Sequence, residues 1–352
     1  MRRLLRMIPL LLGAAGVCGC LPEERIVWSP AGNHALVRGP DRLYLAGADG
    51  QIHPILDARV AHVGWRGEAG FVAVRVVDVT TWKDLQGYLA EPQREKIQLT
   101  AELLLAQLQA QKGEVEDFEP MVRGDLLSAL LYIRDNAWDR LPQPLREKAE
   151  KEGGLPLIRP VYALEAYELT DGEARRTAQL ATTLDDVRAV RLSPDGKVLA
   201  FISAKADADE RKPLVLKVMP AEPGAHPLTV AEGVGPSVAW SPGGDRLAYC
   251  LGRVAEGSET ALWTVFQARL RDAAGKLLAK PDAAPQALVL APSVDLTWLP
   301  DGRLAFVSEQ VGIPAPADEP APVNLFTLKA GGEKPQPVCG AEQASGLVRP
   351  MA

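Results

Sequence analysis

The chain has 352 residues, of which 39 are Lys or Arg and 45 are Asp or Glu, so its formal net charge at pH 7 is −6. An acidic chain lacks the positive surface with which proteins hold nucleic-acid phosphates, so nucleic acid is excluded as the expected partner. After residue 20, no apolar run approaches the length that a membrane-spanning helix needs.

The first 19 residues have the pattern of a secretory signal. Three arginines form a cationic start, and the apolar core over residues 8–17 is too short to span a bilayer. The next residues, Val17-Cys18-Gly19-Cys20, resemble a bacterial lipobox, whose last cysteine is lipid-modified and becomes the mature N-terminus. The resemblance implies removal of residues 1–19 and lipidation of Cys20. The alternative is ordinary cleavage near the same place, which releases a soluble secreted protein.

Removal of the signal changes the expected charge and the expected mode of membrane attachment. Residues 1–19 hold three arginines and no acidic residue, so the net charge moves from −6 to −9. A chain of this charge is not drawn to anionic lipid, so attachment is expected to come from the acyl chains on Cys20. Leu21 follows this cysteine, and by resemblance to the lipoprotein sorting rule a non-acidic residue there implies the outer membrane, facing the periplasm.

A short phrase recurs along the rest of the chain, each time between two apolar runs. Pro presets the backbone for a turn, Asp bonds to its own backbone, and Gly accepts a positive φ angle, so each copy predicts two strands joined by a tight turn. A repeated hairpin cannot bury its apolar face alone and is expected to stack on its neighbours. The copies are Trp28-Ser29-Pro30-Ala31-Gly32, Trp65-Arg66-Gly67-Glu68-Ala69-Gly70, Leu192-Ser193-Pro194-Asp195-Gly196, Trp240-Ser241-Pro242-Gly243-Gly244 and Trp298-Leu299-Pro300-Asp301-Gly302.

These copies resemble the WD40-like repeat of the bacterial TolB-type β-propeller family, whose pattern is an apolar strand, roughly Trp-Ser-Pro-Asp-Gly, and a second strand. The likeness covers residues 26 to about 338, apart from one insertion. It implies an all-β propeller domain over residues 20–352, in the periplasm or at the cell surface, that binds other proteins. It implies no catalytic residue, and we expect no cofactor.

Each blade of such a propeller is expected to have four antiparallel strands, ordered from the innermost to the outermost. Five units are visible, whereas the TolB type has six blades, so a five-bladed ring is preferred and a ring with an unrecognised sixth blade stays open. The expected units cover residues 25–56, 60–79 resumed at 161–180, 187–230, 237–290 and 294–338.

Residues 80–160 depart from the strand pattern and have a helical period instead. One apolar face is expected on a first helix and another on a second, and residues 145–151 are a candidate third helix. The segment is expected to be a helical hairpin or small bundle inserted in the second blade. The first face comprises Ile97, Ala101, Leu104, Leu105 and Leu108, and the second Leu126, Leu127, Leu130, Leu131 and Trp138.

Two other residue types have a structural interpretation. The tryptophans before the turns recur at equivalent positions, so we expect them to pack between blades rather than to bind a ligand.

Cys250 and Cys339 are expected on strands at different distances from the propeller axis, so we predict that they are not bridged. No cysteine or histidine spacing predicts a metal site.

The connections between the second and third strands of each unit are long, varied and acidic. In an antiparallel blade they lie at the end opposite to the Pro/Asp/Gly turns. Varied loops on a rigid scaffold are where proteins place recognition, so we predict that this face binds the partner. The expected partner-binding residues are Asp207, Asp209, Glu210, Glu256, Glu259, Asp318 and Glu319.

The favoured function is therefore a membrane-tethered, non-enzymatic interaction module whose partner is another envelope protein. One alternative is a propeller-type hydrolase or the regulatory propeller of an envelope enzyme; against it, the chain has no Gly-x-Ser-x-Gly motif. Another alternative is a propeller that acts as a spacer and presents the helical insertion to a partner.

Overall fold

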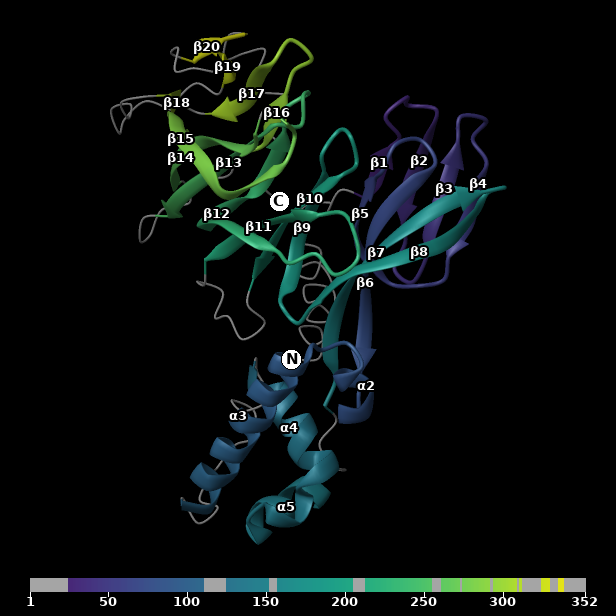
Figure 1. Cartoon of the computed structure of the whole chain (residues 1–352), viewed down its shortest axis with the longest axis vertical. Helices are drawn as coiled ribbons and strands as arrows, with labels where there is room; N and C mark the ends of the chain where they lie inside the picture. The colour runs from purple at the N-terminus through teal and green to yellow at the C-terminus, as the bar shows by residue number, and fades with distance from the viewer. Residues whose placement is uncertain are drawn as a thin grey trace, which may run out of the picture.

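The computed structural model describes residues 25–110, 125–151, 157–204, 213–254, 261–272, 274–291, 294–308, 310–311, 324–329 and 335–338. The described chain is mostly β, with antiparallel sheets in sequence order and a group of helices beyond the ends of β6 and β7 (Figure 1). Cys20 and all seven predicted partner-binding acidic residues lie outside the described residues.

The first sheet has the strand order β1-β2-β3-β4, as the repeat pattern predicts. The turn between β1 and β2 closes with a 2.9 Å hydrogen bond from the Gly32 amide to the Ser29 carbonyl, and Gly32 has a φ of 73° that favours glycine. The strands are β1 (Ile26–Trp28), β2 (His34–Arg38), β3 (Leu43–Gly47) and β4 (Ile52–Leu56).

The second sheet joins two parts of the chain that the helices separate in sequence. Its order is β5-β6-β7-β8, and β6 pairs with β7 from Gly70 opposite Glu168 to Val79 opposite Arg159. Strand pairing thus joins the chain before the helical segment to the chain after it. The strands are β5 (Val60–Trp65), β6 (Gly70–Val79), β7 (Arg159–Thr170) and β8 (Glu173–Thr183).

The helices between β6 and β7 share one hydrophobic core, which also includes Val79 of β6 and Val161 of β7. Both predicted apolar faces contribute to it, because Leu104 and Leu108 of α3 and Leu130 and Leu131 of α4 are all buried in one cluster. The elements are α2 (Trp82–Gln86), α3 (Glu91–Ala110), α4 (Asp125–Asn136), the 3₁₀ helix η3 (Trp138–Arg140) and α5 (Gln143–Lys151). Among the described residues, none of the helices combines the length and the apolar character required to cross a bilayer.

The next sheet has eight strands in the order β18-β15-β14-β13-β12-β11-β10-β9. The prediction of two separate units over 187–230 and 237–290 is wrong at their junction, because β12 is one strand that pairs with β11 and with β13. Gly233 of this strand has a φ of 75°, and the pairing with β13 shifts register between Val234 and Val238. The strand continues through both irregularities. The strands are β9 (Asp186–Leu192), β10 (Val198–Ala204), β11 (Leu214–Pro220), β12 (Leu228–Trp240), β13 (Arg246–Val254), β14 (Ala261–Arg271), β15 (Leu277–Ala291) and β18 (Gln310–Val311).

The last sheet has the order β16-β17-β19-β20. Its strands are β16 (Leu296–Trp298), β17 (Arg303–Ser308), β19 (Asn324–Lys329) and β20 (Gln336–Pro337). The first strands of successive units, which we call the inner strands, follow one another in space: β1 lies against β5, β5 against β9, β9 against β12 and β12 against β16.

Four apolar clusters fill the spaces between successive units. The first joins Leu36 and Leu43 of the first sheet to Phe71 and Tyr167 of the second. The others join the second sheet to β9–β11, β9–β11 to β12–β15, and β12–β15 to the last sheet. Burial of sheet faces against one another is therefore the main apolar contribution to this part of the fold.

Three of the tryptophans before the turns join an inner strand to the inner strand before it. The indole Nε1 of Trp65 donates to the Val27 carbonyl at 2.8 Å, and that of Trp298 donates to the Ala239 carbonyl at 3.1 Å. Trp240 makes the equivalent 3.1 Å bond to the carbonyl of Arg191. The predicted packing between units is confirmed for these three residues. For Trp28 it is wrong, because among the described residues its side chain is 62% exposed.

Candidate functional site

Contacts between successive turns show that these turns share one face of the molecule. The amide of Ala31 donates to Glu68 Oε1 at 2.8 Å, linking the first turn to the second. Gly196 of the third turn lies against the Arg66 side chain, and Gly244 of the fourth lies against Pro194. We call this the turn face.

Antiparallel pairing places the second-to-third connections at the opposite end of the sheets. We call this end the connection face; the helical segment between β6 and β7 begins and ends there, and β10, β13 and β17 end there. All predicted partner-binding residues belong to the last three connections, which lie outside the described residues, so their grouping stays a prediction. The described part of this face is the end of β6 and the chain around α2.

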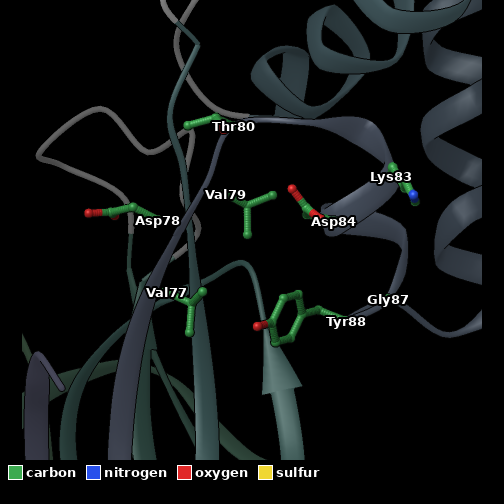
Figure 2. A pocket seen from close by; sticks show the side chains of 8 residues that line it. All are labelled: Val77, Asp78, Val79, Thr80, Lys83, Asp84, Gly87 and Tyr88. Atoms are coloured by element: carbon green, nitrogen blue, oxygen red, sulfur yellow. The ribbon is translucent and has the colours of Figure 1, made fainter. Parts of the chain in front are cut away.

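A cavity of about 480 Å³ opens at this point, between β6 and α2. Figure 2 shows Val79 and Asp84 facing one another across it, Tyr88 reaching toward Val77 from the chain after α2, and Asp78 pointing away from α2. The lining residues are Val77, Asp78, Val79, Thr80, Lys83, Asp84, Gly87 and Tyr88. Sequence reasoning missed the cavity, since it arises where a strand meets a helix and has no motif of its own.

Hydrogen bonds fix the helical wall of the cavity from both sides. Thr81 is the N-cap of α2, and its hydroxyl accepts from the Asp84 amide at 3.1 Å and donates to the Asp84 carboxylate at 2.7 Å. The Trp82 amide donates to Asp135 of α4 at 2.6 Å. After the helix, the Thr182 hydroxyl of β8 donates to the Tyr88 carbonyl at 2.5 Å.

The cavity combines an apolar floor with polar groups at its edge. Val77 and Val79 supply the floor, and the exposed Lys83 and Asp84 stand at the rim. Asp78 is held by Arg59 through hydrogen bonds of 3.0 and 3.2 Å. Carboxylate, ammonium and hydroxyl groups around an apolar surface suit the binding of a polar side chain or small polar molecule.

An ion cluster around the buried Glu165 lies within the second sheet, and no sequence motif indicates it. Glu165 of β7 has no exposed surface, and it accepts two 3.0 Å hydrogen bonds from Arg75, one of 2.9 Å from Arg176 and one of 2.5 Å from the Tyr167 hydroxyl. Burial raises the pKa of Glu165, but the hydrogen bonds from Arg75 and Tyr167 outweigh it, so the pKa lies below its usual value. The cluster holds three neighbouring strands together.

A second ion pair links the turn face to an outer strand. Arg271 of β14 donates to both carboxylate oxygens of Asp195, at 2.7 and 3.0 Å. The hydrogen bond from Arg271 is the main cause that lowers the pKa of Asp195 below its usual range. The sequence predicts Asp195 as a turn residue and gives no indication of this partner.

Cys250 is buried, and burial raises the pKa of its thiol to about 12. Cys339 lies outside the described residues, so the prediction that the two are unbridged remains a prediction. Within the described ranges, no group of three or more His, Cys, Asp or Glu residues is arranged to hold a metal ion.

Comparison with known proteins finds distant structural likeness alone. No protein-family model matches the chain, and neither does any curated protein. Among solved structures, a putative TolB from Agrobacterium tumefaciens is 12% identical with a TM-score of 0.40, over 90% of this chain and 79% of that one. The gluconolactonase XC5397 from Xanthomonas campestris is 12% identical with a TM-score of 0.36, over 86% and 81%.

A chain of the mitotic checkpoint complex is 13% identical with a TM-score of 0.39, over 90% of this chain; the present chain spans 63% of that one. The similar structures thus include a TolB as well as an enzyme. Because identities and TM-scores are this low, the likeness carries no argument about activity.

Proposed function

We propose that this protein is an envelope β-propeller, tethered through a lipidated Cys20, that binds another envelope protein by its connection face and does not catalyse a reaction. The observation that supports it most directly is the series of contacts between turns, from Ala31–Glu68 to Pro194–Gly244. The uniform turns share one face of the molecule, so the varied connections are expected on the opposite face. Varied loops on a rigid scaffold are where proteins place partner recognition.

The proposal takes the units as five propeller blades. Each inner strand lies against the one before it, and three of the four junctions have a Trp indole bonded to a carbonyl of the preceding inner strand. At the remaining junction Leu192 stands in the Trp position and packs against Gly64. The helical segment is then an insertion in the second blade, between its second and third strands.

The chemistry of the connection face suggests the kind of partner. Its predicted contact residues are all acidic, and Asp84 adds a further exposed carboxylate at the cavity between β6 and α2. Opposite charges across an interface speed association and select among partners. A partner surface rich in Lys and Arg fits this face.

The test compares charge reversals on the two faces after chemical cross-linking in whole cells and purification from membranes. On the connection face the variant is Asp207→Lys with Glu210→Lys. The matched control on the turn face is Glu173→Lys with Glu222→Lys, both at exposed positions. Mass spectrometry identifies the proteins that the unmodified chain captures.

We expect the captured partner to be reduced at least tenfold by the connection-face variant and to be retained by the turn-face control. Equal capture by both variants, or loss only with the turn-face control, would contradict the assignment of the binding face. Added salt is expected to weaken capture by the unmodified chain, because exposed charges are screened.

The anchor is tested separately. Cys20→Ser removes the acceptor thiol, so the protein is expected to move from the membrane fraction to the soluble fraction while keeping its fold. Capture of the partner by soluble Cys20→Ser protein would show that the propeller binds without the tether. Continued membrane association of this variant would rule out lipidation at Cys20 as the means of attachment.

One observation favours a second candidate, in which the helical segment carries the specificity. Leu99 and Leu103 of α3 are 62% and 64% exposed, and with the exposed Ala106 and Ala110 they form an apolar stripe at alternating spacings of four and three. Such a stripe is typical of a helix that packs against another helix. Leu99→Glu with Leu103→Glu tests it, with the exposed Gln107→Glu as the control. Loss of capture with the first variant alone supports this candidate.

A further inference from the structure

The strand β6 has an edge that its neighbour β5 covers only in part. Pairing with β5 spans Phe71 to Arg75. It is followed on this side by the 2.8 Å hydrogen bond from the Val76 amide to the Arg59 carbonyl, and among the described residues no strand pairs with β6 beyond that point. On the other side β7 pairs with β6 as far as Val79. Figure 1 shows β6 continuing past β5 toward α2.

Strand geometry directs the backbone of Asp78 to this open edge. The backbone N–H and C=O groups of successive residues in an antiparallel strand point to opposite sides. Because the Val76 amide bonds toward β5, Asp78 presents its N–H and C=O to the same side two residues later. Val77 and Val79 direct theirs to β7. An open donor and acceptor on an exposed strand edge form a template for pairing with another strand.

The cavity between β6 and α2 lies along this edge. Its lining includes the four consecutive residues from Val77 to Thr80, whose side chains alternate between the two faces of the sheet. Among the described residues none of β7 lines it. A hollow that neighbours of opposite orientation both line lies beside the strand rather than over one face. The open edge of β6 therefore borders a cavity of about 480 Å³.

We propose that this edge receives an extended segment of the protein partner, which continues the second sheet in line with β5 by pairing with the N–H and C=O of Asp78. In this mode of recognition the main-chain hydrogen bonds give affinity and alternate side chains give specificity. The inference rests on the proposed function, because the edge lies on the connection face, and it names the part of the partner that binds there.

The size of the cavity favours a short segment over a second copy of the chain. Its volume lies within the range of about 300–1,000 Å³ that is usual for small-ligand sites, which admits a few residues of extended chain and excludes a folded sheet. The four residues that border it, at about 3.3 Å each, span about 13 Å. A segment of about four residues is therefore enough to cover the open edge.

The side chains around the edge indicate the composition of the segment. Residues of an added strand that stand opposite Val77 and Val79 share their face of the sheet and point toward α2. Figure 2 shows the Asp84 carboxylate facing Val79 across the cavity, whereas Lys83 points away from β6. A Lys or Arg side chain suits this arrangement, because its apolar stem lies along the valines while its charged end reaches Asp84.

The walls of the site are already ordered. Arg59 holds the Asp78 carboxylate through hydrogen bonds of 3.0 and 3.2 Å, on the side away from α2, so this side chain stays clear of the cavity (Figure 2). On the opposite wall the Thr81 hydroxyl donates to Asp84 at 2.7 Å. Binding of an extended segment therefore costs little free energy for ordering the protein.

The first test is amide hydrogen exchange, followed by NMR in the Cys20→Ser chain without any ligand. The Asp78 amide is expected to exchange at least about tenfold faster than the amides of Val77 and Val79, which are bonded to β7. Equally slow exchange at all three would show that the edge is already covered and would overturn the inference. Exchange at Asp78 that slows as the protein concentration rises would assign the edge to a second copy, with the same consequence.

The second test uses a synthetic probe, the peptide acetyl-Thr-Lys-Val-Lys-Val-Lys-Thr-amide. Saturable binding is expected, and it is expected to slow exchange at Asp78 at least about tenfold. The same peptide with Glu in place of Lys is expected to bind at least about tenfold more weakly, because it meets Asp84 with like charge. A peptide N-methylated at its five central residues lacks the main-chain donors and is expected not to bind. Binding of the N-methylated peptide as tight as that of the parent would rule out strand addition.

Matched variants at Asp78 separate the backbone from the side chain. Asp78→Pro removes the edge N–H, and proline is tolerated on a strand edge that faces solvent. Asp78→Ala loses the same contact with Arg59 but keeps the N–H. The proline variant is expected to weaken binding of the Lys peptide at least about tenfold relative to the alanine variant. Equal binding by the two variants would contradict pairing at Asp78.

The contribution of Asp84 is measured in the same assay. Asp84→Asn keeps the size of the side chain and removes its charge, and it is expected to weaken binding of the Lys peptide severalfold. Glu95→Gln, at an exposed position of α3, is the matched control and is expected to leave binding unchanged. Equal effects of the two changes would contradict the assigned contact with Asp84.

The outcomes separate this inference from the proposed function. Capture of the partner that depends on Asp207 and Glu210, without any protection of Asp78 by the peptide, would overturn strand addition and leave the connection face as the binding face. Protection of Asp78 by the Lys peptide, together with equal capture by the two charge-reversal variants, would support the open edge and contradict the role of the acidic connections.

Discussion

Arg271 and Asp195 are 76 residues apart in the chain, yet the guanidinium of the first donates to both carboxylate oxygens of the second. The Ser193 hydroxyl also donates to Asp195, at 2.6 Å, and accepts from the Val198 amide at 3.0 Å. A turn that the sequence explains locally is thus also a tether between β14 and the start of β10.

This tether predicts a loss of stability at low pH. The folded-state pKa of Asp195 lies below the unfolded value of about 3.9. The ionised carboxylate therefore adds to the free energy of unfolding above pH 4, and this stabilisation is lost as the pH falls through the folded-state pKa. Asp195→Asn is expected to cost about 1 kcal/mol at pH 7, a modest figure because the side chain is 37% exposed and screened by solvent. Urea unfolding at pH 7 and pH 3 measures both effects.

The control for this change is Asp301→Asn, which stands at the equivalent place in the last turn and pairs with its neighbour Arg303 at the surface. Asp301→Asn is expected to lower the free energy of unfolding by less than Asp195→Asn does. Equal losses for the two variants would show that the ion pair between Arg271 and Asp195 adds nothing to stability.

The buried cluster around Glu165 predicts a larger effect. Glu165→Gln leaves the 27% exposed Arg75 guanidinium without its charge partner, and the loss of hydrogen bonds to a charged group costs about 1.5–3 kcal/mol. The exposed Glu168→Gln on the same strand is the matched control, with an expected change near zero. Chemical unfolding gives both values, and a loss under 1 kcal/mol for Glu165→Gln would contradict the structural role of the cluster.

Close packing at Gly252 predicts that a single methyl group is not tolerated. A Cβ at this position would lie 2.3 Å from the ring of Trp263, which is buried between β12–β15 and the last sheet. Gly252→Ala is expected to destabilise the fold by about 2 kcal/mol or more, because the ring must move. Gly243→Ala meets only Asp245 at 3.3 Å and serves as the control in thermal unfolding.

The indole hydrogen bonds predict a measurable loss of stability when Trp is replaced by Phe, which removes the N–H donor together with part of the indole ring. Trp240→Phe and Trp298→Phe each lose a 3.1 Å bond to the preceding inner strand and are each expected to cost about 1–2 kcal/mol. The two changes lie in different interfaces and are expected to be nearly additive in the double variant. A double variant as stable as the single ones would show that these bonds do not hold the units together.

Residue patterns by themselves predicted the parts of the fold that depend on near neighbours. The Pro/Asp/Gly phrases predicted the tight turns, and the switch from strand to helical period at residue 80 predicted where the helices begin. Apolar spacing also predicted which residues of α3 and α4 are buried. Turn type and helix periodicity are set by a few consecutive residues, which is why local patterns suffice.

Only the tertiary structure decided how these elements meet. The continuity of β12, the burial of Glu165 between Arg75 and Arg176, and the cavity beneath α2 all depend on residues far apart in the chain. Trp28 and Trp65 stand in the same local pattern, yet one is exposed and the other buried. The difference comes from whether another sheet lies against the strand, and no local pattern contains that information.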